Sequence, residues 1–279
     1  MFSTATNYHS HCSFCDGRAP MEDFVQAAIA EHFVAYGISS HAPQPFDYKW
    51  TMSYEEMPAY LNEFNRLKNK YAGEIELYVG LEIDYLDEIN NPAHPYYQQL
   101  PLDYRMGSVH VIQTPEGRSV DIDAGPGGFE MILYGEFGGD LQKLVTTYFD
   151  ASMRMVETGG FDFIGHCDKI HHNIKKVSKG FTDSDWYKSK LKEYFSLVAE
   201  KEIMIEINTK SYRKIASFFP DESVFGILND MKIPVLVNSD AHLPEYINSS
   251  RQLAIDLLKA SGFRTIRQLL GGKWQDTEI

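Results

Sequence analysis

Cysteine is scarce in this sequence, with three residues (Cys12, Cys15 and Cys167) among 279. So few cysteines, in an odd number, argue against the disulfide framework of a small secreted domain. No apolar run approaches the length of a membrane span, and residues 1–7 lack the basic start and apolar core of a signal peptide. We therefore expect a cytoplasmic protein that does not bind membranes.

Positive charge is also limited. Lys and Arg total 26 against 39 for Asp and Glu, which gives a formal net charge of −13. Such a chain repels polyanions on average, and this disfavours extensive binding of nucleic acid. A small anion can still bind wherever a few basic side chains converge. The oligomeric state has no signature in the sequence.

The pattern of hydrophobicity is that of repeated β-then-α units, because short apolar runs alternate with longer amphipathic stretches. A hydrophobic content of 43% over this length suits one domain spanning residues 1–279. Strands are predicted at residues 7–11, 35–39, 77–84, 105–111, 161–166, 203–208 and 235–239. Helices are predicted after Pro20 and at residues 53–71, 141–158, 185–201, 221–231, 249–260 and, in a short form, 265–270.

One stretch, residues 113–140, does not fit this alternation. It holds two groups of glycines, Gly125 to Gly128 around a proline and Gly138 with Gly139. A long loop in a compact domain is usually functional or mobile. We predict an inserted loop here that acts as a substrate lid.

Side chains of the types that bind metal ions follow or end most of the predicted strands. Because the strands of an α/β barrel present their C-terminal ends at one face, these side chains are expected to meet there. A single histidine at a strand end is more often a hydrogen-bonded structural residue than a ligand. The set as a whole predicts a metal site formed by His9, His11, Asp16, His41, Glu82, His110, His166, Asp240 and His242.

The spacing within this set supports the same conclusion. Residues two apart in a strand face the same side, so His9 and His11 can chelate one ion together, and Asp240 and His242 repeat the spacing. Nitrogen and carboxylate ligands with few thiolates suit zinc, manganese or iron.

Six short motifs, read in order, resemble those of the PHP (polymerase and histidinol phosphatase) family, and the resemblance runs from Tyr8 to His242. They are His9-Ser10-His11 with Asp16-Gly17, Ser40-His41-Ala42, Gly80-Leu81-Glu82-Ile83-Asp84-Tyr85, Gly107-Ser108-Val109-His110, Gly165-His166 and Asn238-Ser239-Asp240-Ala241-His242. The resemblance implies an α/β fold, a distorted TIM-like (β/α)7 barrel, with three divalent metal ions at the C-terminal face of its strands.

The resemblance also implies which residues hold which ion. His9, His11, Glu82 and Asp240 would bind the first, and Glu82, His110 and His166 the second, so that Glu82 bridges the two. Asp16, His41 and His242 would bind the third. Many relatives have a histidine one residue after the position of Asp16, where this chain has Gly17.

A further segment, residues 206–214, resembles the histidinol-phosphatase branch of the family, as does Gly165-His166-Cys167-Asp168-Lys169. There the residue matching Arg213 is expected to grip the substrate phosphate, a task suited to a planar bidentate donor. Lys169 and Arg18 are further candidates for phosphate contact. The implied reaction is hydrolysis of L-histidinol phosphate in histidine biosynthesis, with a metal-activated hydroxide attacking phosphorus. Asp240 or His242 would supply the leaving group with a proton.

Other functions stay open at this stage. A related phosphoesterase acting on another small ester or nucleotide is the nearest alternative, and a nuclease fits poorly with the net charge. An amidohydrolase would share the His-x-His pair but usually uses a carboxylated lysine where this chain has Glu82. A non-catalytic metal-binding module would have no need of Arg213.

The remaining histidines and the cysteines are given structural interpretations. Cys12 and Cys15 form one C-x-x-C pair without a second pair to complete a zinc site, so we predict inert loop residues near the site. Surface positions are predicted for His32, His94, His171 and His172.

Overall fold

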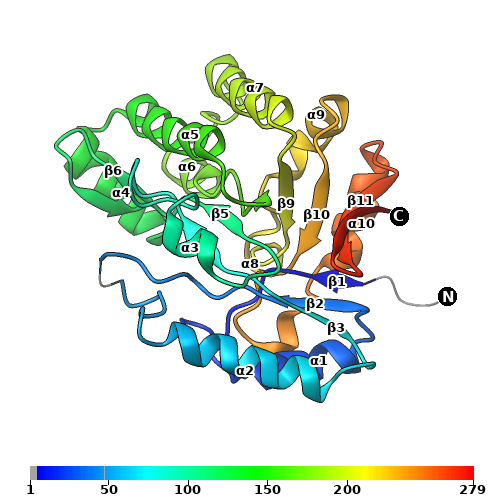
Figure 1. Cartoon of the computed structure of the whole chain (residues 1–279). Helices are drawn as coiled ribbons and strands as arrows, with labels where there is room; N and C mark the ends of the chain where they lie inside the picture. The colour runs from blue at the N-terminus through cyan, green and yellow to red at the C-terminus, as the bar shows by residue number, and fades with distance from the viewer. Residues whose placement is uncertain (1–4, 47) are drawn as a thin grey trace.

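The computed structural model describes residues 5–46 and 48–279, and parallel strands form its core (Figure 1). One sheet has the order β1-β2-β3, and a second has the order β10-β9-β8-β5-β4; every pair in both sheets is parallel. Their bounds are β1 (Thr6–Asn7), β2 (Ala35–Ile38), β3 (Glu76–Val79), β4 (Glu82–Asp84), β5 (Met106–Ser108), β8 (Phe163–Ile164), β9 (Met204–Asn208) and β10 (Val235–Asn238).

Two bridges join these sheets into a ring. Ser10, after β1, pairs in parallel with Ala241, after β10, and His41, after β2, pairs with Glu82 in β4. The predicted strand at 77–84 is thus real but divided into β3 and β4. Gly80 lies at the division, where a Cβ atom would come within 2.3 Å of the Tyr104 ring inside the barrel. The strands therefore form the distorted β/α barrel that the sequence predicts.

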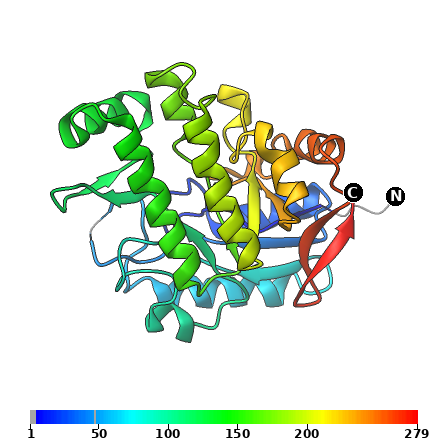
Figure 2. The ribbon, with the colours of Figure 1, turned by 90° about the horizontal axis from the view of Figure 1, so that it is seen from above.

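Helices surround the strands, with α1 and α2 on one side and α5, α7 and α9 on the opposite side (Figure 1). The two longest, α5 and α7, run alongside each other in the turned view (Figure 2). No helix in the described part of the chain is long and apolar enough to cross a membrane. The longer helices are α1 (Met21–Ala30), α2 (Met57–Lys70), α5 (Leu141–Thr158), α7 (Asp185–Glu200) and α10 (Arg251–Ala260). The shorter ones are α3 (Pro95–Gln99), α6 (His171–Val177), α8 (Tyr212–Ile215), η1 (Glu222–Val224), α9 (Phe225–Asp230) and η2 (Pro244–Tyr246).

Residues 113–140 are more ordered than the predicted loop. They contain the strand β7 (Ser119–Asp121), which pairs antiparallel with β6 (Val111–Gln113), and the helix α4 (Gly125–Phe137). Phe129, Leu133 and Phe137, spaced four apart, are buried on one face of α4. This apolar spacing is typical of a helix. The loop was predicted instead because the glycines on both sides of the segment were given more weight.

The short helix predicted at residues 265–270 is wrong. The segment is the strand β11 (Thr265–Leu270), which forms a hairpin with β12 (Lys273–Glu278). Gly271 and Gly272 make the connection with φ values of +57° and +73°, the conformation that two-residue hairpin turns require and glycine supplies. The Gly-Gly pair was therefore the available signal for a hairpin.

This C-terminal hairpin closes the barrel at the ends where the strands begin. Leu269 and Trp274 pack with Tyr8 and with buried residues from the starts of several strands, among them Ala35, Met106 and Phe163. The Tyr8 hydroxyl also donates to the Leu269 carbonyl and accepts from its amide, both at 2.9 Å. The face with the ends of the strands is left open.

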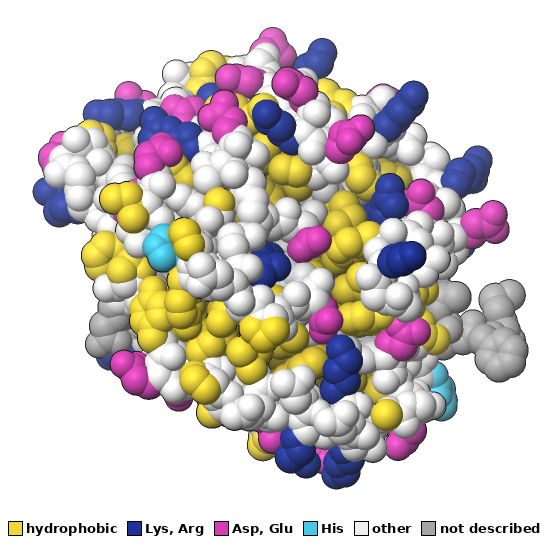
Figure 3. Space-filling view, in the orientation of Figure 1, with side chains coloured by type: hydrophobic (Ala, Val, Ile, Leu, Met, Phe, Trp, Pro, Cys, Tyr) yellow, Lys and Arg dark blue, Asp and Glu magenta, His cyan; other side chains and the backbone are white. Residues whose placement is uncertain are grey.

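The surface carries mixed charge. On the face seen in Figure 3, Lys and Arg side chains are interspersed with Asp and Glu, and an apolar area lies between them. This face presents no continuous basic stripe of the kind that tracks a nucleic-acid backbone.

Replacement of Leu269 by Ala should lower the free energy of unfolding by about 2–4 kcal/mol, because the change removes apolar burial and leaves a cavity. Urea unfolding followed by circular dichroism measures this difference. Leu253→Ala on α10, where the side chain is 37% exposed, is the matched control and should change stability by less than about 0.5 kcal/mol. Equal losses in the two variants would contradict a core role for the hairpin.

Candidate metal centre

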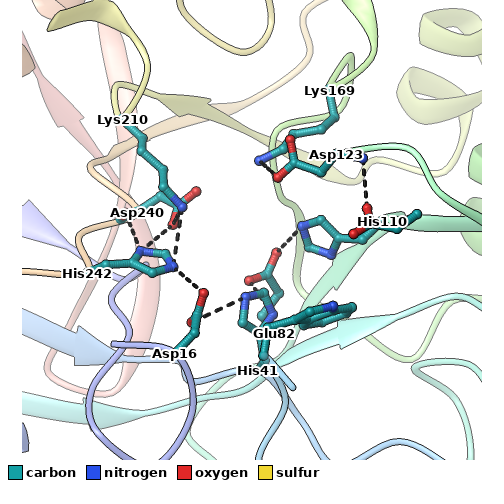
Figure 4. A pocket seen from close by; sticks show the side chains of 11 residues that line it. Asp16, His41, Glu82, His110, Asp123, Lys169, Lys210, Asp240 and His242 are labelled. Atoms are coloured by element: carbon teal, nitrogen blue, oxygen red, sulfur yellow. Dashed lines mark hydrogen bonds and ion pairs between the residues drawn. The ribbon is translucent and has the colours of Figure 1, made fainter. Parts of the chain in front are cut away.

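The ends of the barrel strands bring all nine predicted metal-binding side chains together. Figure 4 shows part of this cluster around the pocket at the open end of the barrel. Three sets of ligand atoms lie within 4.8 Å of one another and match the expected grouping closely: His9, His11 and Glu82; Glu82, His110 and His166; and His11, Asp16, His41 and His242. Asp240 forms a further set with His9 and His166.

Glu82 lies at the centre of the cluster, with 1% of its surface exposed. Its Oε2 atom is 3.2 Å from His9 Nε2 and 3.3 Å from His11 Nε2. Its Oε1 atom is 2.9 Å from His166 Nε2 and accepts a hydrogen bond from Ser108 at 2.7 Å. Each oxygen thus faces a different group of imidazoles, which is the arrangement of a carboxylate that can bridge two ions.

The cluster contains a buried acceptor without a donor. Asp16 Oδ1 has no hydrogen-bond partner in the described structure, and it lies 3.8 Å from both His11 Nδ1 and His41 Nε2. A buried carboxylate oxygen left unpaired is unfavourable unless a cation lies nearby. The donor set of imidazoles and carboxylates also suits a divalent metal. The residues therefore fit metal ions at this position.

The electrostatics of the cluster favour ionised carboxylates. Burial raises the pKa of Glu82, yet His41 and His9 outweigh this effect and hold it well below its usual value. Burial lowers the pKa of His9, but the carboxylates of Glu206 and Asp240 raise it overall, to about 9. The ring nitrogens that carry these protons are the atoms that would bind a metal ion, so metal binding here would release protons.

Two carboxylates that the sequence analysis missed orient the ligands. Glu206 on β9 accepts a hydrogen bond of 2.7 Å from His9 Nδ1, which leaves His9 Nε2 directed at Glu82. Asp84 on β4 does the same for His110 Nδ1 at 2.8 Å. Such partners fix the tautomer and ring orientation of a metal-binding histidine. The available signal was position, because both residues lie on strands that end at the site.

The backbone is strained where two ligands enter the site. Asp240 and His166 have φ values of +48° and +26°, a region that residues other than glycine rarely adopt. Both follow the last residues of their strands and turn their side chains into the mouth of the barrel. Strain of this kind concentrates at functional sites, where the surrounding structure holds it.

Basic side chains line the space next to the cluster. A pocket of about 150 Å³ opens over Glu82, and a neighbouring cleft of about 410 Å³ shares four of its residues. Lys210, also missed from the sequence, lines both and places Nζ 3.0 Å from Asp240 Oδ1 and 3.3 Å from His242 Nε2. Arg18 and Arg213 line the cleft but not the pocket.

The predicted phosphate-binding residues therefore lie in two places. Arg213 on α8 is exposed, with its guanidinium 4.3 Å above the ring of Tyr246. Lys169 is buried in the pocket on another side, where its Nζ atom lies 3.1 Å from Asp123 Oδ2 (Figure 4). The structure does not bring Lys169 and Arg213 to a common point in either cavity.

The remaining predictions have mixed outcomes. Cys15 lies beside the cluster, with Sγ 3.5 Å from His11 Nδ1, and Cys12 is buried; both are free thiols. His32 is exposed, as predicted. The surface position predicted for His171 is wrong, because this residue is buried and contacts the Tyr187 hydroxyl at 3.2 Å.

Comparison with known proteins gives one consistent answer. A Deinococcus radiodurans protein named "Probable histidinol-phosphatase" is 25% identical over 266 residues, which cover 92% of this chain and 94% of that protein. A Bacillus subtilis protein named histidinol-phosphatase is 21% identical, over 84% of this chain and 92% of its own length.

A solved structure has the same fold. The histidinol phosphate phosphatase of Lactococcus lactis, in complex with zinc, L-histidinol and phosphate, matches 98% of this chain and 99% of its own, with a TM-score of 0.71 and 18% identity. The sequence model of the PHP domain matches residues 7–210, most of the chain and all but two of the predicted metal ligands. The chain belongs to the PHP domain family.

Proposed function

We propose that this chain is a metal-dependent phosphomonoesterase that hydrolyses L-histidinol phosphate to L-histidinol and phosphate. The observation that carries the proposal is a buried cluster of histidines and carboxylates around Glu82, open to a cleft lined by basic side chains. The names of the relatives, and the histidinol and phosphate bound in the Lactococcus lactis structure, favour this substrate over other small phosphate esters.

The nine clustered side chains are assigned to three divalent ions of zinc, manganese or iron. His9, His11, Glu82 and Asp240 would hold one, Glu82, His110 and His166 the second, and Asp16, His41 and His242 the third. Their mutual distances support each group. Divalent ions in such a site supply a nucleophile at neutral pH, by lowering the pKa of water to about 7, and neutralise phosphoryl oxygens.

Lys210, Arg213 and Arg18 are assigned to the substrate phosphate. All three line the cleft beside Asp240 and His242, so a phosphate seated at the cluster lies next to cationic donors. Guanidinium groups bind phosphate oxygens in pairs and absorb negative charge that develops in the transition state. Lys169 also lines the pocket, but Asp123 already balances its charge.

The leaving alkoxide needs a proton, and the geometry favours Lys210 as its source. Burial and the neighbouring His11 lower the pKa of His242 to about 4, so this imidazole is neutral at neutral pH. Burial raises the pKa of Asp240, but Lys210 and His9 hold it well below its usual value, so Asp240 is ionised. The Lys210 Nζ atom lies 3.0 Å from Asp240 Oδ1 and 3.3 Å from His242 Nε2, so its N–H groups lie at the edge of the cluster.

Steady-state phosphate release from L-histidinol phosphate tests the proposed function. Protein reconstituted with manganese, zinc or iron should show a higher kcat/KM for this ester than for other phosphomonoesters or a phosphodiester. Faster hydrolysis of another ester would keep the metal chemistry and reject the substrate. No turnover of any ester by metal-loaded protein would instead indicate a binding module.

Removal of one ligand tests the cluster. His11→Ala should lose bound metal and lower kcat by more than about 100-fold, a larger effect than the 10- to 100-fold typical of losing an outer partner of a ligand. Metal content by mass spectrometry and kcat are measured on the same sample. His172→Ala, outside the cluster, is the control and should retain both; a metal-free but active His11→Ala protein would refute the assignment.

The basic cleft has a separate test. Lys210→Ala and Arg213→Ala should each lower kcat/KM by about 10- to 100-fold, the equivalent of one hydrogen bond to a charged group, with bound metal unchanged. Lys188→Ala removes the same charge from an exposed position on α7 and should leave kcat/KM as it is. Loss of metal in the Arg213 variant would rule out its assignment to the phosphate.

A further inference from the structure

The cleft beside Asp240 and the far side of the pocket differ in charge. The cleft beside Asp240 is lined by four cationic side chains, Arg18, Lys210, Arg213 and Lys214. On the opposite side of the pocket from Lys210, past Glu82, lie Lys169 and Asp123 (Figure 4), and Asp121 lines the same pocket. The substrate of the proposed function has a matching charge separation, with an anionic phosphate at one end and a cationic ammonium along its chain.

The local fold directs both acidic side chains to the pocket. Asp121 is the last residue of β7, where it pairs with Val111, and the Ile122 amide donates to the His110 carbonyl at 2.9 Å. Ile122 is fully buried in the core. The chain turns directly after β7, and the Asp123 amide donates to Asp121 Oδ1 at 2.8 Å, so the two carboxylates lie close together and both line the pocket. His110, a proposed metal ligand, lines the same pocket beside them.

Asp121 is the carboxylate of this pair whose charge is not balanced by a lysine or arginine. Asp123 forms its ion pair with the buried Lys169. Asp121 Oδ1 accepts a hydrogen bond from the Asp123 amide at 2.8 Å, and among the described residues no Lys or Arg forms an ion pair with it. A carboxylate at the wall of a small pocket, with no lysine or arginine beside it, can form a charge-assisted hydrogen bond with a cationic group of the ligand.

An aromatic surface completes this side of the pocket. Trp50 lines the pocket with its ring 4.7 Å from His41, and Tyr48 stacks on Trp50 at 5.3 Å. Burial raises the pKa of Tyr48, and the nearby carboxylates of Asp84 and Asp121 add to this effect. A flat apolar surface thus lies close to the acidic group, as a ligand that joins an ammonium to an aromatic ring requires.

We propose that Asp121 determines specificity by binding the ammonium group of the substrate, with Asp123 beside it and Trp50 against the imidazole ring. The inference rests on the proposed function, because it takes the phosphate to be held at the metal cluster and the basic cleft. A site that hydrogen-bonds an N–H group of its substrate strongly disfavours analogues that lack this group. An apolar pocket discriminates much less against a ligand that lacks one methylene. Asp121 would therefore favour amino-alcohol phosphates over simple alkyl phosphates.

The variant Asp121→Asn tests this role with little disturbance of the fold, because asparagine keeps an oxygen that can accept from the Asp123 amide. Two esters are compared in the metal-loaded protein: L-histidinol phosphate and imidazolylpropyl phosphate, which lacks the amino group. For the first, kcat/KM should fall about 10- to 100-fold, as expected for the loss of one charged hydrogen bond. For the second it should change less than about twofold, and metal content should be unchanged.

The control is Glu116→Gln, which removes one negative charge from the turn of the same hairpin, where the side chain is 55% exposed. Both esters should keep their wild-type kcat/KM in this variant. An equal change for both esters in Asp121→Asn, or no change for either, would overturn the assignment while the wild-type preference still supports the proposed function. Wild-type protein that hydrolyses other esters but not L-histidinol phosphate would overturn both.

Discussion

The buried charge of Glu82 is the constraint on which the rest of the site depends. A carboxylate with 1% of its surface exposed must be compensated, since an isolated buried charge is strongly unfavourable. Five imidazoles surround it, and some of these are held in turn by Glu206 and Asp84. The cluster therefore concentrates both signs of charge in a water-poor space. Divalent ions in place of protons would relieve this crowding, so metal binding and the stability of the barrel mouth are expected to be linked.

One end of the barrel is packed with apolar side chains, and the other end carries the polar candidate site. Where the strands begin, the β11–β12 hairpin and aromatic side chains such as Tyr104 and Trp274 fill the interior with apolar contacts. Where the strands end, polar side chains replace them. The cluster residues come from strands held in register by their neighbours, and the strained φ angles of Asp240 and His166 are maintained by that support. A rigid apolar base thus holds a polar site in a fixed geometry.

The sequence predicted the strands and the clustering of the metal-type side chains for a physical reason. Parallel strands are short apolar runs, and their C-terminal ends are forced to one face, so position along the chain translates into position in space. Position marks Glu206 as a residue near the site, but the roles of Lys210 and Glu206 depend on which atoms they face, and the sequence does not give that. The helix predicted at 265–270 is wrong because Ile266, Leu269 and Leu270 have helical spacing, and because the partner strand β12 is largely exposed and polar and gives no strand signal of its own.

The net charge of −13 and the proposed binding of an anion are compatible because they act over different distances. Beyond about 8–10 Å the solvent screens individual charges, so a polyanion meets mainly the mixed, acidic surface and is repelled. Arg18, Lys210 and Arg213 line the cleft together, and in the proposed function they would act directly on a small phosphate. Asp121 on the far wall adds an opposing field across the pocket. A ligand with separated charges lowers its energy by aligning with that field. A dianion without a cationic group would instead be repelled by the Asp121 carboxylate. The same local asymmetry that allows an acidic protein to bind phosphate can therefore select which phosphate ester it binds.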